Sequence, residues 1–358
     1  MNKWLFLFTC SIFTASAFAQ EQSLRELYAK PQHEWPAIIS SKDVPAAPLK
    51  PLKAKPIKQN DEIIALGEKL FNDTRLSRDN TVSCASCHES RLAFSDRRKL
   101  AVGIDGQVGT RNTQAIIGID HWQSFFWDGR AKTAAQQALM PIENPIEMGS
   151  SVELVLNKIN RAEDYKKPIL NAFGKEALNK ELLALSLVAF ERTFDIPESL
   201  FTRFIDKAQT SPSEAVALLD DQQLEGLHLF RTKARCMTCH EGALLSDNEF
   251  HVTGLHFYGR KLQDLGRFDA TQYSADIGKF RTPSLLALKQ STPWMHHGGF
   301  QSLLGIVNFY NAGGARPKPR KKFKDDHDPN YPQTTELLHK LELSKDEKNA
   351  LIAFLETL

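Results

Sequence analysis

Two copies of the pattern Cys-x-x-Cys-His stand out, at residues 84–88 and 236–240. Two thiols at this spacing can bond to the two vinyl groups of one haem, and the histidine that follows can bind the iron. Zinc is the alternative, because Cys-x-x-Cys also suits tetrahedral thiolate coordination. A histidine directly after each pair favours haem, so the pattern predicts two covalently bound haem c groups. The predicted thioether residues are Cys84, Cys87, Cys236 and Cys239, and the predicted proximal ligands are His88 and His240.

The N-terminus predicts export. Lys3 gives a positive start, residues 4–18 are an apolar run, and Ala17 and Ala19 are the small residues that a signal peptidase requires. The run is too short for a membrane span with these flanks. We therefore expect residues 1–19 to be a signal peptide and the mature protein to lie in the periplasm. Cys10 would leave with the signal, so that all four remaining cysteines attach haem.

Charge gives little sign of a macromolecular partner. The formal net charge is only +2, which does not favour nucleic-acid binding. One basic run stands out, and a solvated loop explains it better than a docking patch for an acidic partner, although both interpretations stay open. The run comprises Arg316, Lys318, Arg320, Lys321, Lys322 and Lys324.

The elements that must hold the haems form a weak internal repeat. Residues 67–71 (Gly-Glu-Lys-Leu-Phe) precede the first haem motif, and residues 226–230 (Gly-Leu-His-Leu-Phe) precede the second. Residues 182–190 are strongly apolar, and Ser344 with Glu347 predicts a capping box before a C-terminal helix. Strand-like alternation is scarce. We therefore expect an all-α fold of two cytochrome c-like domains, each binding one covalent c-type haem.

Four segments are predicted along the chain. The signal peptide at 1–19 is followed by an extension at 20–57, which is polar and rich in Pro, Lys and Ala. The first cytochrome c domain would occupy 58–205, and the second would occupy 206–358.

Four further blocks resemble the bacterial dihaem cytochrome c peroxidases, a family that includes the methylamine-utilisation (MauG-type) enzymes. They read Phe-Trp-Asp-Gly-Arg-Ala at 126–131, Pro-Ile-Glu-Asn-Pro-Ile-Glu-Met at 141–148, Phe-Arg-Thr-Pro-Ser-Leu at 280–285 and Met-His-His-Gly-Gly at 295–299. With the two haem motifs in the same order, the resemblance covers the chain from about Ile63 to its C-terminus. It implies a hydrogen-peroxide-dependent oxidoreductase.

The resemblance implies that peroxide binds at the first haem, on the face opposite His88. Counting along the blocks places the residues of that face at Gln137, Pro141 and Glu147. A carboxylate beside bound peroxide can take a proton from one oxygen and deliver it to the other, so Glu147 is the predicted acid–base residue. Some members cap the resting first haem with a histidine, and that position here is Ile104. Isoleucine cannot bind iron, which predicts a first haem that is open to peroxide.

Between and beyond the haems, the resemblance implies three further roles. Trp127 would lie between the haems and carry electrons, in addition to packing as a large aromatic residue. Tyr310 takes the place of the usual methionine ligand of the second haem, as in MauG-type enzymes. Met295, His251, His256, His296 and His297 are alternative ligands, and His297 replaces an aspartate usual in its block.

A calcium site is also implied between the domains. Asn112 and the backbone carbonyls of Ser291 and Pro293 match it, and such neutral oxygen ligands suit Ca²⁺.

Three functions compete at this point. The first is a detoxifying peroxidase supplied by a small periplasmic redox protein, either a cytochrome c or a cupredoxin. The second is a MauG-type enzyme that oxidises side chains of a partner protein, although the tryptophan through which that enzyme passes oxidation is Ala234 here. The third is a non-enzymatic electron carrier, against which Glu147 and Ile104 both argue.

Overall fold

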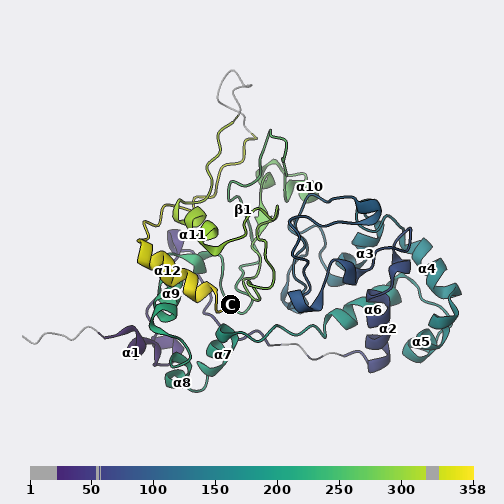
Figure 1. Ribbon diagram of the computed structural model, residues 1–358, viewed down its shortest axis with the longest axis horizontal. Helices are drawn as coiled ribbons and strands as arrows, with labels where there is room; N and C mark the ends of the chain where they lie inside the picture. The colour runs from purple at the N-terminus through teal and green to yellow at the C-terminus, as the bar shows by residue number, and fades with distance from the viewer. Residues whose placement is uncertain (1–21, 54–55, 57, 320–329) are drawn as a thin grey trace, which may run out of the picture.

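The computed structural model describes residues 22–53, 56, 58–319 and 330–358. The predicted signal peptide lies outside these residues, as do Arg320 to Lys324 of the basic run. The described part is mostly helical, with one antiparallel sheet of two very short strands (Figure 1). The prediction of an all-α fold with two cytochrome c-like domains is confirmed. Among the helices of the described residues, none combines the length and the apolar character that a membrane crossing requires.

The first half of the chain builds one hydrophobic core. α2 packs along α6, and both contribute buried leucines, such as Leu66 and Leu183, to this core. Asn60 caps α2 by accepting a hydrogen bond from the backbone N–H of Ile63. The helices are α2 (Asp61–Phe71), α3 (Ala134–Glu143), α4 (Val152–Arg161), α5 (Glu163–Phe173) and α6 (Lys180–Glu191).

The second half, together with the N-terminal extension, builds the other core. Here α9 packs along α12, and Ser344 and Glu347 form the predicted capping box at the start of α12. Tyr28, Trp35 and Leu49 of the extension are buried in this core. The elements are α1 (Leu24–Tyr28), α7 (Leu200–Lys207), α8 (Pro212–Val216), α9 (Asp221–Arg231), β1 (Phe250–His251), α10 (Phe268–Thr271), β2 (Phe280–Arg281), α11 (Leu303–Asn311) and α12 (Lys345–Leu355).

The internal repeat has a packing reason. A Cβ atom on Gly67 of α2 would lie 2.0 Å from the carbonyl oxygen of Ser186 on α6. A Cβ atom on Gly226 of α9 would lie equally close, 2.0 Å, to the carbonyl oxygen of Ala350 on α12. Glycine therefore permits the same close helix crossing just before each haem motif.

The cores change over between Phe194 and Phe201, since Phe194 packs in the first core and Phe201 in the second. This is a few residues before the predicted division at 205 and 206, which stays a prediction.

A buried charged network ties the two halves together. Arg111 donates to both carboxylate oxygens of Asp264 in the second half, at 2.8 and 2.7 Å. It also contacts Asp128 at 2.5 Å, and Asp128 in turn pairs with Arg130. The backbone N–H of Arg281 on β2 donates to the carbonyl of Trp127 at 2.8 Å. These contacts fix the two haem motifs relative to each other.

Candidate functional site

The first cavity opens beside the first haem motif and holds about 1570 Å³ of space, including its mouth. Cys84, Cys87 and His88 lie on its wall. The Nδ1 atom of His88 lies 2.6 Å from the carbonyl oxygen of Phe94. Because a carbonyl only accepts hydrogen bonds, Nδ1 carries the proton and Nε2 is left as the ligand atom. Burial lowers the pKa of His88, which keeps the ring neutral and able to bind a metal.

The predicted peroxide residues line the same cavity. Gln137 and Pro141 come from α3, and Glu147 follows shortly after that helix. The Nδ2 atom of Asn144 donates to Oε1 of Glu147 at 2.7 Å, which holds the carboxyl group in place. Burial raises the pKa of Glu147, and the nearby charge of Arg130 opposes that rise in part. Glu147 therefore gives the cavity a fixed, partly buried carboxyl group.

Ile104 does not line the cavity, although its backbone is bonded to that of Glu147. Its backbone N–H donates to the carbonyl of Glu147 at 3.0 Å. Its side chain is fully buried, and a Cβ atom on Gly149 would lie 2.3 Å from its Cδ1 atom. The side chain at position 104 thus fills the core of the first domain.

A second acid of the first cavity was missed from the sequence. Glu191 is the last residue of α6 and lines the cavity, yet it is only 5 % exposed and its Oε2 atom has no hydrogen-bond partner in the described part of the chain. Burial raises its pKa to about 8, so the group is largely neutral at pH 7. The sequence held a signal for this buried acid, because Glu191 directly follows the apolar segment at 182–190.

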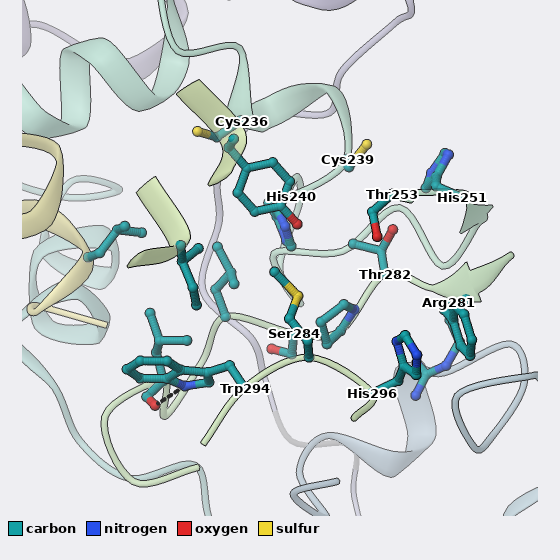
Figure 2. Close-up of a pocket in the computed structure, with 18 of the residues that line it drawn as sticks. Cys236, Cys239, His240, His251, Thr253, Arg281, Thr282, Ser284, Trp294 and His296 are labelled. Atoms are coloured by element: carbon teal, nitrogen blue, oxygen red, sulfur yellow. Dashed lines mark hydrogen bonds between the residues drawn. The ribbon is translucent and has the colours of Figure 1, made fainter. Parts of the chain in front are cut away.

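The second cavity lies beside the second haem motif, with Cys236, Cys239 and His240 on its wall (Figure 2). Nδ1 of His240 lies 3.0 Å from the carbonyl oxygen of Leu245, which again leaves Nε2 as the ligand atom. Burial lowers the pKa of His240. Tyr310 enters the same cavity from α11, and burial raises the pKa of its hydroxyl.

The alternative ligands are not equally placed. Met295, His251 and His296 line the second cavity, whereas His256 and His297 are absent from its wall. His251 Nε2 is held by Asp247 Oδ2 at 2.7 Å. Tyr310, Met295 and His296 are thus the candidates whose side chains reach the cavity without such a carboxylate.

Two tryptophans line both cavities. Trp127 donates from Nε1 to the carbonyl of Asn112 at 2.9 Å. Trp122, which the sequence did not single out, donates to the carbonyl of Ile117 at 2.9 Å. The guanidinium of Arg281 lies 3.7 Å above the Trp122 ring. Indole rings therefore form part of the partition between the cavities.

Arg281 supports the assignment of haem to both cavities. This side chain is 4 % exposed and lines both, and its Nη1 atom has no partner among the described residues. Burial lowers its pKa to about 9. A buried cation needs an anion, and a haem carries two carboxylates on the edge away from its vinyl groups. In Figure 2, Arg281 and His296 indeed lie on the side of the cavity away from Cys236. The donors present fit a haem, although the sequence predicted no role for Arg281.

The three residues predicted to bind calcium belong to one cavity wall. Asn112, Ser291 and Pro293 all line the second cavity. Asn112 donates from Nδ2 to the carbonyl of Arg98 at 2.9 Å, which leaves Oδ1 as the atom for a cation. An amide oxygen and backbone carbonyls are hard, neutral ligands that fit Ca²⁺.

Comparison with known proteins places the chain among dihaem enzymes. A family model described as di-haem cytochrome c peroxidase matches residues 61–210. The methylamine utilization protein MauG of Methylorubrum extorquens is 34% identical over 354 residues, which cover 98% of this chain and 89% of that protein. The cytochrome-c peroxidase IdrP1 of a Pseudomonas species is 30% identical, with 88% of this chain and 85% of that protein covered.

Solved structures show the same fold. A MauG-like protein associated with microbial copper homeostasis superposes with a TM-score of 0.71 and 27% identity, covering 88% of this chain and 93% of that one. The diheme peroxidase BthA from Burkholderia thailandensis gives a TM-score of 0.70 at 22% identity, covering 90% of this chain and 92% of that one.

Proposed function

The chain belongs to the di-haem cytochrome c peroxidase family, whose members hold two c-type haems, and from this premise we propose that it is a periplasmic peroxidase that reduces hydrogen peroxide at the first cavity. The observation that carries the proposal is the convergence of Gln137, Pro141 and Glu147 on the cavity that His88 enters. Cys84, Cys87 and His88 would hold a haem there, and this haem would supply the redox-active iron for peroxide reduction.

Glu147 is proposed to move the proton. Its raised pKa brings the carboxyl group closer to neutral pH, where a group can both accept and return a proton. The hydrogen bond from Asn144 fixes Oε1, which leaves Oε2 to exchange the proton with peroxide. Gln137 can donate a hydrogen bond to the same substrate, and Pro141 limits the space and excludes water.

The second cavity is proposed to receive electrons for the first. His240 and Tyr310 would ligate its haem iron, and Trp127, which lines both cavities, would pass the electrons across. The raised pKa of Tyr310 means that its phenolate forms only when a cation such as ferric iron compensates it. An anionic oxygen ligand favours the oxidised iron and lowers its reduction potential.

A MauG-type activity on a partner protein is the second candidate. The 34% identity to a methylamine utilization protein MauG, the tyrosine at position 310 and the isoleucine at position 104 favour it. Ala234, buried in the core beside the second haem motif, argues against the same exit route for oxidation.

The remaining assignments complete the proposal. We propose Ca²⁺ at Asn112, Ser291 and Pro293, a signal peptide at 1–19, and a small redox protein or a protein substrate as partner.

A pair of substitutions tests the acid–base role. Glu147→Gln keeps the shape and removes the titrating proton, and it should slow peroxide reduction by about 10²- to 10⁴-fold. Glu143→Gln, on the exposed side of α3, is the matched control and should leave the rate unchanged. Equal rates in the two variants would refute the assignment of Glu147.

A further inference from the structure

A column of rings connects the second cavity with the surface. His296 stacks on Phe280, with ring centroids 3.6 Å apart and planes 8° from parallel, and both line the cavity. His297 extends the column, with its ring centroid 4.9 Å from that of His296 and the two ring planes 25° from parallel. The ring of Phe257 lies 5.3 Å beyond His297. Because His297 is only partly buried, the column runs from the cavity wall to solvent.

The outer end of this column lies among basic residues. On one side, Gly298 follows His297 and packs against the backbone of Lys99. A Cβ atom added to Gly298 would lie 2.1 Å from the Lys99 carbonyl oxygen. On the other side, Phe257 starts a turn in which the N–H of Arg260 donates to its carbonyl at 2.9 Å. Arg260 then reaches the carbonyl of Lys318 at 3.4 Å. The basic patch, as we define it, consists of Arg97, Arg98, Lys99, Arg260, Lys261 and Lys318, all exposed.

The charge of the basic patch is not cancelled locally. None of its six members forms an ion pair within the part of the chain that the structure describes. Asp264 is the acid that acts electrostatically on His297, and Arg111 already binds both of its oxygens. Asp96, beside Arg97, is buried and bonded to Thr113 at 2.9 Å. Since the whole chain carries a net charge of only +2, the patch is a local concentration of positive charge.

One apolar residue is exposed in the same turn. Leu262 follows Lys261 and is 64% exposed. An exposed apolar residue beside like charges suits a transient protein interface, because the charges steer the partner and the apolar atoms are desolvated on contact.

We propose that the basic patch docks an acidic protein that donates one electron at a time, and that the His297–His296 column carries each electron to the wall of the second cavity. The inference rests on the proposed peroxidase function, which supplies the oxidant. Two donor molecules are each oxidised by one electron. Those two electrons and two protons convert one hydrogen peroxide into two water molecules. Packed rings shorten the through-space gaps that an electron must cross between the surface and the cavity.

Binding gives a test that does not depend on activity. The probe is a fluorescently labelled acidic cupredoxin, titrated with the full mature haem-loaded protein. Reversing two patch charges, K99E with K261E, should weaken binding by about tenfold or more at low salt, and the difference should shrink at about 0.5 M salt. The matched control reverses two exposed lysines, Lys175 after α5 and Lys180 at the start of α6 (K175E with K180E), and should bind like the wild type. Equal loss in both pairs, or no loss in the patch variant, would overturn the docking surface.

Turnover then separates this proposal from the peroxidase proposal. Hydroquinone is a small neutral donor that needs no docking surface. Wild type, patch variant and control should oxidise it at the same rate with peroxide, whereas only the patch variant should show a raised KM for the cupredoxin. If the wild type oxidises no hydroquinone, the peroxidase proposal fails, and the binding result still decides the docking surface.

The ring column has its own test. His297→Phe keeps a ring in the stack, and His297→Ala removes it. Electron transfer from the bound cupredoxin, followed by stopped flow at saturating donor, should be retained by the Phe variant and slowed in the Ala variant, with unchanged binding in both. Equal rates in the two variants would refute the column as the route.

Discussion

Glu191 gives the most quantitative prediction, because its environment is simple. The carboxyl group is buried at the end of α6, its Oε2 atom has no hydrogen-bond partner within the described residues, and burial is the one cause of its pKa shift. Burial raises its pKa from 4.5 to about 8. At 1.36 kcal/mol per pK unit, ionising this group in the folded protein costs about 5 kcal/mol more than in the unfolded chain.

The sign of the pH effect follows from which state holds the proton. Between pH 4.5 and pH 8 the unfolded chain loses the Glu191 proton while the folded protein keeps it. Unfolding therefore becomes more favourable as pH rises through this window. Glu191→Gln is neutral in both states and removes this dependence. Relative to the wild type, the variant should gain about 3 to 4 kcal/mol of unfolding free energy between pH 5 and pH 8.

Urea unfolding followed by circular dichroism, at pH 5 and pH 8, measures this gain. Glu181→Gln is the matched control, since Glu181 is an exposed acid at the start of the same helix. Its stability difference from the wild type should not widen with pH. A difference for Glu191→Gln that stays constant from pH 5 to pH 8 would show that the carboxyl group is ionised at pH 7 and paired with an unseen partner.

Two further predictions follow from the cofactor and the packing. Tyr310→Met replaces an anionic ligand by a thioether, so a redox titration should give a more positive reduction potential for the second haem. The expected shift is about 0.1 V or more, within the ~0.8 V range that different axial ligands span. An unchanged potential would mean that another residue is the ligand. Gly226→Ala should lower the unfolding free energy by about 1–3 kcal/mol despite the better helix propensity of alanine, because the new Cβ would lie 2.0 Å from the Ala350 carbonyl oxygen. Gly109→Ala, where the nearest atom is 3.5 Å away, should change stability little, and a similar loss at both positions would contradict the packing argument.

The haem motifs, the helical fold and the glycine repeat could be predicted because each depends on local spacing. A Cys-x-x-Cys-His segment needs no distant residue to be identified, and the glycines at 67 and 226 stand in the helical segments that precede their motifs. The resemblance to a family located Glu147 and Tyr310, which spacing alone would not have done.

The residues that sequence reasoning missed act across the fold. Arg281 matters because β2 places it on the wall of both cavities. Glu191 matters because the end of α6 places it on the wall of the first cavity. The extension at 20–57 is polar in composition, yet Tyr28 and Trp35 are buried in the second core. Burial of this kind depends on contacts between residues far apart in the chain, for which composition gives no sign.

The central claim is that the first cavity accepts and reduces peroxide without prior opening. The most direct measurement mixes the diferric, haem-loaded mature protein with one equivalent of hydrogen peroxide in stopped flow, without reductant, and follows haem absorption and remaining peroxide. We predict rapid peroxide consumption and a matching change in the haem spectrum, at a rate that the Glu147→Gln variant loses. No reaction until one haem has been reduced would contradict the account.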